Sequence, residues 1–314
     1  MADWKPTVAI IGSGALGSYY GGRLAQHGHD VHFLLRSDYG VVVRNGLSIR
    51  SCHGDFALPS SVLRVYNDPH RMPRADLVIV TLKATANDQY EALIRPLIKD
   101  NTVILTLQNG LGNEERLAEL FGTEHILGGL AFVCVNRIAP GVIHHLDYGL
   151  IRVGEFIEGN TANAERIVRL FTGSRIECNV LQSLRYGRWE KLVWNVPFNG
   201  LGAVLDMATD RLLAQASGEE LVRRIMGEVV AAAAAWGIHL PPDAIEQRIH
   251  LTRTMGAYRS SMQIDRALGR PMEVEAILGE PVRAAQRAGI QVPHMATLYH
   301  LAAIVNSGNL QTKK

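Results

Sequence analysis

Cysteine is scarce in this sequence, with three residues among 314. Cys52, Cys134 and Cys178 lie far apart, their number is odd, and no two follow the C-x-x-C spacing. This distribution excludes a disulfide framework and the common zinc motifs of paired cysteines. Three structural thiols in a reducing compartment are the simplest interpretation, and we expect a cytoplasmic protein.

Long hydrophobic runs and an excess of one charge are also missing. No stretch of about 18 apolar residues occurs, so we expect no membrane-spanning helix and no membrane partner. Lys and Arg number 32 against 30 Asp and Glu, a formal charge of +2 that argues against a nucleic-acid partner. A chain of 314 residues with 47% hydrophobic and 20% charged side chains is instead typical of a globular protein with two domains.

Clustered histidines are the remaining hint of a metal, and we expect none to be bound. His27, His29 and His32 fall at one turn, but no carboxylate-supported ligand geometry accompanies them. His144 and His145 are consecutive on a predicted strand, so one should point into the core and the other away from it.

A glycine-rich turn between a strand and a helix is the first motif with chemical meaning. Residues 7–11 are β-branched or apolar, GSGALG follows, and a helical stretch ends at Gly28 before a second strand, DVHFLL. In this order Gly12 permits a tight turn, Gly14 lets the backbone approach a pyrophosphate, and Gly17 lets the helix pack on the strand. A turn without a ligand is the alternative. The predicted cofactor-binding residues here are Gly12, Ser13, Gly14, Ala15, Leu16 and Gly17.

Arg36 closes the second strand, 19 positions after Gly17, and bears on the choice of cofactor. An Asp or Glu there would bind the ribose hydroxyl of NAD, whereas a guanidinium suits the 2′-phosphate of NADP(H). We therefore expect NADP(H). A solvated loop arginine is the alternative interpretation.

Two further apolar strands run into polar residues. The stretch ADLVIVTL is followed by Lys83, and VILTLQ by Asn109, with a helix predicted over 87–98 between them. Ligands of open α/β sheets bind outside the carboxyl ends of the strands, so both residues should lie near the glycine turn. Each could also be an ordinary strand-end lysine or turn asparagine. Residues 125–154 alternate short strands with turns, which predicts an antiparallel extension of the sheet.

Strand patterns give way to helical periodicity near residue 182. We therefore predict two domains, an α/β dinucleotide-binding domain of the Rossmann type over 1–182 and an all-α domain over 183–314. Within the second domain, Ser217 with a glutamate three residues later predicts a helix start, and Gly237 predicts its end.

The segment EKLVWNVPFNGLGA places three polar residues in an apolar helix. Lys191, Asn195 and Asn199 follow the spacing i, i+4, i+8 and form one slanting stripe. Such a stripe faces either a cleft or solvent, because amphipathic helices need a polar side. Two asparagines and Pro197 inside the helix favour a functional cleft.

The chain resembles the ketopantoate reductase (2-dehydropantoate 2-reductase) family nearly end to end. The stretches that carry the resemblance are IGSGALGSYYGGRLA, LLR, TLKA, LQNGLGNEE, RIAPGVI, EKLVWNVPFNGLGA and SSMQIDRALGRPMEVEAILG. The resemblance implies NADPH-dependent reduction of a 2-oxo acid, in the first place of 2-dehydropantoate to pantoate in pantothenate biosynthesis. It also implies an active site between the two domains, and it is compatible with a homodimer.

The resemblance implies residue roles as well. Lys191 would be the general acid that protonates the substrate carbonyl oxygen, which a lysine in a desolvated cleft can do near neutral pH. Glu273 would be the catalytic glutamate that orients the substrate hydroxyl and the lysine. The implied substrate-binding residues are Asn195, Asn199, Ser261, Lys83 and Asn109, and Lys83, Asn109 and Glu273 are implied to line the cofactor too.

Three positions depart from the family pattern. Met272 replaces the usual Thr, Leu278 replaces an Asn, and Tyr258 stands where another polar side chain is common. These departures leave open a related reductase acting on a different 2-oxo acid. A non-catalytic NADPH-binding sensor is the second alternative, although a sensor would not require Lys191 and Glu273 together.

Overall fold

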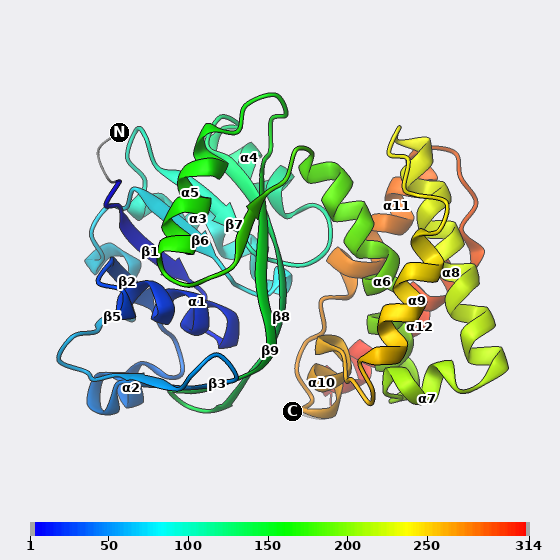
Figure 1. The fold of residues 1–314 in the computed structure, drawn as a ribbon, viewed down its shortest axis with the longest axis horizontal. Coiled ribbons are helices and arrows are strands. Elements are labelled where there is room, and N and C mark those ends of the chain that lie inside the picture. Colours follow the sequence, from blue (N-terminus) through cyan, green and yellow to red (C-terminus); the bar gives the residue numbers. More distant parts are fainter. Residues whose placement is uncertain (1–3, 312–314) are drawn as a thin grey trace. The chain divides into compact units, whose positions relative to one another are not determined.

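The computed structural model describes residues 4–311, and it divides into two compact units (Figure 1). Among the described residues, unit 1 comprises the chain up to Gln108 together with Asn113–Leu184. Unit 2 comprises Asn109–Gly112 and the chain from Arg185 onward. None of the helices within residues 4–311 has the length and apolar character that crossing a membrane would require.

Unit 1 is built on one mixed sheet, whose described strands run in the order β4-β3-β9-β8-β7-β6-β1-β2-β5, with β10 beside β9. The strands are β1 (Thr7–Ile11), β2 (Asp30–Leu34), β3 (Leu47–Ser51), β4 (Phe56–Leu58), β5 (Arg64–Tyr66), β6 (Leu77–Val80), β7 (Val103–Thr106), β8 (Ile126–Ala139), β9 (Val142–Glu155) and β10 (Cys178–Val180).

The centre of this sheet is parallel, because β2, β1, β6, β7 and β8 pair side by side in one direction. The chain leaves β1 toward β2 on one side and later returns to β6 on the other. The crevice between β1 and β6 is therefore the topological switch point where such sheets bind ligands. β8 and β9 pair antiparallel, which confirms the predicted extension of the sheet.

Helices cover both faces of the sheet because successive strand residues point to opposite sides. Val8 and Ile10 of β1 belong to one buried cluster with α1 and α5, while Ala9 and Ile11 belong to another with α3 and α4. The helices are α1 (Ala15–Gln26), α2 (Tyr39–Asn45), α3 (Tyr90–Ile94), α4 (Asn113–Phe121) and α5 (Ala162–Gly173), with short 3-10 turns η1 (Pro69–Arg71), η2 (Ala84–Gln89) and η3 (Arg95–Leu97).

The helical segment predicted over 87–98 is confirmed, although it is not one α-helix. The chain passes from η2 through α3 to η3, and a proline occupies η3.

Unit 2 consists of helices packed around one apolar core. They are α6 (Leu184–Leu205), α7 (Thr209–Leu213), α8 (Ala216–Ala235), α9 (Ala244–Thr254), α10 (Ser261–Ala267), the π-helical turn η4 (Glu275–Gly279), α11 (Glu280–Arg287) and α12 (Pro293–Gln311). The predicted cap at Ser217 was wrong, because α8 already begins at Ala216 and Gln215 holds the extended cap conformation. Gly237 has a φ of 75°, as expected just beyond a helix end.

Residues 109–112 follow β7 in the chain but pack with unit 2. The Leu111 N–H donates to the Ala276 carbonyl at 2.9 Å, and Gly110 has a φ of 87°. A Cβ on Gly110 would lie 2.2 Å from the Ala276 oxygen, so only glycine permits this approach. The division into units therefore places Asn109 with the helices, which the sequence did not indicate.

Substitution of Gly110 tests this docked segment. Gly110→Ala should lower the free energy of unfolding by about 2–5 kcal/mol, because a left-handed alanine costs about 1–2 kcal/mol and the clash adds about 1–3 kcal/mol. Gly122→Ala is the matched control, because Gly122 also has a positive φ of 86° but a Cβ there would meet no heavy atom within 4 Å. The measurement is the denaturant midpoint. Equal losses in both variants would contradict the docking of Gly110 on Ala276.

Candidate active site

The glycine turn stands at the carboxyl end of β1, and its three glycines meet different constraints. Gly12 has a φ of 97°, and a Cβ there would lie 2.5 Å from the Leu82 nitrogen. At Gly17 a Cβ would lie 2.4 Å from Thr81 Oγ1, so helix α1 packs directly on the neighbouring strand end. At Gly14 the nearest heavy atom would be 3.9 Å away, and the backbone is exposed. The protein therefore leaves space at Gly14 alone, where a pyrophosphate would approach.

The N-terminus of α1 is prepared for an anion. The helix begins at Ala15, and among the described residues no side chain caps it at Gly14. The N–H groups of its first turn and the positive end of the helix dipole favour a phosphate there. Ser18 Oγ donates to the Ser13 carbonyl at 3.0 Å and Thr81 Oγ1 to the Gly12 carbonyl at 2.7 Å, which holds the turn. Sequence reasoning missed Thr81.

Arg36 is exposed on the loop after β2, two residues before a buried carboxylate. Asp38 pairs with Arg137 and accepts hydrogen bonds from Ser37 Oγ at 3.0 Å and the Gly141 N–H at 3.2 Å. Sequence reasoning missed this ion pair. Because Arg137 balances the charge of Asp38, the loop carries no uncompensated carboxylate to repel a 2′-phosphate.

The carboxyl ends of β6 and β7 carry further polar groups. Lys83 is exposed at the start of η2, and its carbonyl accepts from the Ala86 N–H at 2.9 Å. Gln108 is buried and takes part in two side-chain hydrogen bonds. Its Oε1 accepts from the Tyr90 hydroxyl, and its Nε2 donates to Asn87 Oδ1 at 2.9 Å. Lys83 and the glycine turn thus belong to neighbouring strand ends of unit 1, because Ile11 of β1 pairs with the last residue of β6.

Lys191 lies on α6 in unit 2 and donates from Nζ to Asn109 Oδ1 at 2.9 Å. The pKa of Lys191 is lowered from 10.5 to about 7, chiefly by burial and further by the positive charge of Arg188, against the opposing effect of the Glu273 carboxylate. Arg188 is itself buried one turn earlier on the helix, and sequence reasoning missed it. A lysine with this pKa exchanges its proton near neutrality, as a general acid must.

The remainder of the stripe on α6 is buried, so its interpretation as a solvated helix face was wrong. Asn195 is 5% exposed and Asn199 is 3% exposed. Asn199 Oδ1 accepts from Ser261 Oγ at 3.3 Å and from the Met262 N–H at 3.4 Å. Asn199 therefore holds the start of α10, where Ser261 is exposed.

The two glutamates of the segment PMEVEA have opposite environments. Glu273 is 7% exposed and lies just before the helical turn, near enough to Lys191 to influence its pKa. Glu275 is largely exposed and accepts from Arg283 Nη2 at 2.9 Å and Tyr299 Oη at 3.0 Å. The first thus acts on the charge of Lys191, and the second forms a surface ion pair.

The departures from the family pattern are mostly packing residues. Met272 and Leu278 are each 1% exposed and belong to the apolar core of unit 2. Tyr258 packs beside Trp194, with ring centroids 5.9 Å apart. Met272 and Leu278 fill the core, so they weigh little against the substrate class that the family implies.

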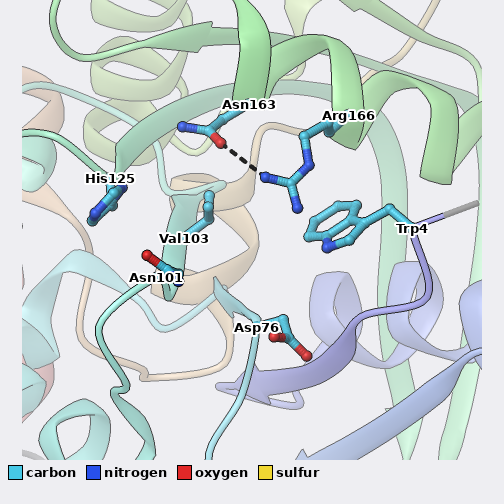
Figure 2. Close-up of a pocket in the computed structure, with 7 residues that line it drawn as sticks. All are labelled: Trp4, Asp76, Asn101, Val103, His125, Asn163 and Arg166. Atoms are coloured by element: carbon cyan, nitrogen blue, oxygen red, sulfur yellow. Dashed lines mark hydrogen bonds between the residues drawn. The ribbon is translucent and has the colours of Figure 1, made fainter. Parts of the chain in front are cut away.

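A polar cavity of about 330 Å³ opens at the other end of the sheet (Figure 2). Asp76 and His125 immediately precede β6 and β8, so the cavity adjoins the amino ends of the parallel strands. The Arg166 guanidinium carbon lies 4.2 Å from the centroid of the Trp4 ring, and Arg166 Nη1 donates a hydrogen bond to Asn163 Oδ1. The cavity is therefore separate from the glycine turn. Its lining residues are Trp4, Asp76, Asn101, Val103, His125, Asn163 and Arg166.

Comparison with known proteins identifies the family. The model described as "Ketopantoate reductase PanE/ApbA" matches residues 8–158, and its C-terminal counterpart matches residues 183–306. The chain belongs to the ketopantoate reductase family. The protein is an oxidoreductase, and the cofactor of its family is NADP(H). An α/β domain followed by a helical domain, as the resemblance implied, is confirmed.

Individual relatives agree with this assignment. A 2-dehydropantoate 2-reductase from Nostoc sp. is 44% identical over 306 residues, covering 96% of this chain and 95% of the relative. The crystal structure of 2-dehydropantoate 2-reductase from Geobacter metallireducens has a TM-score of 0.92 and 47% identity, covering 94% of this chain and 98% of that one. A reductase structure from Methylococcus capsulatus has a TM-score of 0.87 and 34% identity, covering 96% and 97%.

The loop around Arg36 generates a prediction on cofactor binding. Arg36→Ala should weaken NADPH binding by roughly ten- to a hundredfold and leave NADH binding unchanged, because a charge-assisted phosphate contact contributes about 1.5–3 kcal/mol. Arg44→Ala is the matched control, since it removes an exposed cation from α2 in the same unit. Titration calorimetry measures both. Equal NADPH affinity in Arg36→Ala and wild type would remove Arg36 from the site.

Proposed function

We propose that this chain reduces 2-dehydropantoate to pantoate with NADPH, and that Lys191 is the proton donor. The observation that carries the proposal is the partly buried Lys191 ammonium, which donates to Asn109 and has its pKa lowered to about 7. A structural lysine gains nothing from such desolvation, whereas a general acid does. This favours a catalytic protein over an NADPH-binding sensor.

The cofactor residues fit a dinucleotide phosphate. Gly14 and the first turn of α1 would hold the pyrophosphate, Arg36 the 2′-phosphate, and Lys83 the region near the nicotinamide. NADPH, when bound, supplies the hydride that is added to the carbonyl carbon of the substrate. The protein's own contribution is then to orient the substrate and to deliver one proton.

Lys191 delivers this proton to the carbonyl oxygen as negative charge develops on it. The N–H bond of the ammonium breaks, the alcohol O–H forms, and the neutral amine regains a proton from water afterward. Asn109 accepts a hydrogen bond from Lys191 and so fixes the direction of the ammonium. Burial and the positive charge of Arg188 keep the pKa of Lys191 low, while Glu273 limits that decrease.

The substrate would be held by the polar groups around the lysine. Asn195 lies one helical turn beyond Lys191, and Ser261 is presented by α10, which Asn199 holds in place. Glu273 would accept a hydrogen bond from the substrate hydroxyl, a group that simple 2-oxo acids lack. The carboxylate at this position therefore predicts selectivity for a hydroxylated 2-oxo acid.

A panel of 2-oxo acids with NADPH tests the substrate. We expect kcat/KM to be highest for 2-dehydropantoate and lower for the analogue without the hydroxyl group, with NADPH oxidation followed by absorbance. Higher efficiency with the analogue would indicate the related reductase with another substrate. Binding of NADPH without turnover of any panel member would indicate the sensor.

Lys191 generates a prediction on pH. Because the lowered pKa means that the proton is lost above about pH 7, kcat/KM for reduction should fall as pH rises through that value. Lys191→Ala should lower kcat by about 10²–10⁴ and abolish this limb of the profile. Lys191→Arg is the control, because it keeps the charge but cannot release a proton near neutrality. Wild-type kcat in either variant would contradict the proton-donor role, provided that NADPH affinity is retained.

Glu273 and Glu275 form a second test with an internal control. Glu273→Gln should fold normally and lose roughly ten- to a hundredfold in kcat/KM, because a neutral amide forms weaker hydrogen bonds than a carboxylate. Glu275→Gln should keep wild-type kinetics, since its carboxylate is engaged with Arg283 at the surface. Steady-state kinetics compare the two, and the reverse result would exchange their roles.

The cytoplasmic location and the homodimer stay predictions. Light scattering after gel filtration tests the assembly, and a monomer at micromolar concentration would contradict it.

A further inference from the structure

Three metal-ligating side chains that the proposed reaction does not use meet in unit 1. Cys52 and His53 occupy the turn between β3 and β4, and His145 lies in β9. Ser51, the last residue of β3, pairs with His145 in the sheet, which brings the turn against the histidine. Among the described residues these three offer ligand atoms that all lie within 4.8 Å of one another.

His145 has its ring fixed for metal binding. The side chain is 1% exposed, and its Nε2 lies 3.1 Å from the Asp147 carbonyl oxygen and 3.0 Å from that of Tyr148. Carbonyl oxygens only accept, so Nε2 carries the hydrogen in the neutral ring and Nδ1 keeps a lone pair. A ligating histidine typically donates its other N–H to a carbonyl or carboxylate in just this way.

The ligand atoms lie close enough together to be drawn onto one tetrahedral ion. Cys52 Sγ lies 3.7 Å from His145 Nδ1 and 4.0 Å from Nε2, so the sulfur would rotate toward the Nδ1 lone pair when an ion binds. With a Zn–S bond of about 2.3 Å and a Zn–N bond of about 2.05 Å, a tetrahedral angle separates the two atoms by about 3.6 Å. Cys52 and His53 are exposed on the turn, so small rotations can bring their atoms onto the ion while His145 stays in place.

The turn is held in position by a buried arginine of α1. Arg23 Nη2 donates to the carbonyls of His53 at 3.3 Å and Gly54 at 3.1 Å, and to Ser51 Oγ at 3.0 Å. The ligands are thereby held close together before an ion binds, which reduces the entropic cost of binding. Ser51 Oγ lies 2.9 Å from His145 Nδ1, so its hydroxyl would give up that contact to the ion.

We propose that Cys52, His53 and His145 bind one zinc-type divalent ion, with water at the fourth position. Thiolate and imidazole are the ligands that Zn²⁺ and Co²⁺ favour. Binding forms one S–metal and two N–metal bonds, and the thiol proton of Cys52 passes to solvent. The ion would fasten the turn between β3 and β4 to β9.

Cobalt titration of the full-length protein, freed of metal by chelation, tests the proposal. Wild type should develop a thiolate-to-cobalt absorption band and the visible bands of tetrahedral cobalt at one equivalent, and Zn²⁺ should displace them. Cys52→Ser should abolish the thiolate band, and His53→Gln should weaken Co²⁺ binding by at least roughly tenfold. Cys134→Ser should bind as wild type does.

The variants also separate this site from adventitious binding. His53 and Cys52 are both exposed, so their substitution should leave folding and NADPH binding intact, as circular dichroism and calorimetry can verify. A thiolate band that survives in Cys52→Ser, or its absence in wild type at one equivalent, would overturn the proposal. Equal zinc-induced stabilisation of wild type and His53→Gln would do the same.

Discussion

The hydrogen bond from Lys191 to Asn109 is the interaction on which the candidate site depends. A buried ammonium is costly unless an acceptor faces it, and Asn109 supplies that acceptor at 2.9 Å. Asn109 can do so because the following residues turn sharply: Gly110 has a left-handed φ, and Leu111 donates to Ala276. A segment that continues a Rossmann strand is thus folded onto the helices, and the catalytic candidate and its partner belong to one compact unit.

The nucleotide edge of unit 1 depends on a different constraint, the close packing of α1 on the parallel strands. Gly17 lets the helix approach Thr81, and Thr81 in turn binds the Gly12 carbonyl. These contacts leave Gly14 uncovered at the helix N-terminus. The three glycines of one short motif therefore meet three different surroundings, and only Gly14 has open space beside it.

Neighbouring charges balance one another at both candidate sites. Asp38 would oppose a phosphate near Arg36 if it were uncompensated, but Arg137 from β8 neutralises it. Around Lys191, the like charge of Arg188 and the opposite charge of Glu273 act against each other, and burial decides the result. In both places an opposite charge comes from a part of the chain that is distant in sequence, Arg137 for Asp38 and Glu273 for Lys191, and it sets the electrostatic character that a cofactor or substrate would meet.

Local patterns were sufficient to predict much of this protein. The strand at residues 7–11, the antiparallel extension and the helical second half follow from periods of two and 3.6 residues, and the family follows from motifs of the chain. An error arose at Ser217, where a capping signal lies inside the helix that it was expected to begin. The order of elements, the glycine turn at the end of the first strand and the family could therefore be inferred from residue order alone. The burial of the α6 stripe, the influence of Glu273 on Lys191, and the convergence of Cys52, His53 and His145 emerged only from the folded chain. They did so because burial, pKa shifts and ligand geometry depend on neighbours contributed by other parts of the chain. Periodicity reports which face of an element is apolar, but not which residues are placed against it.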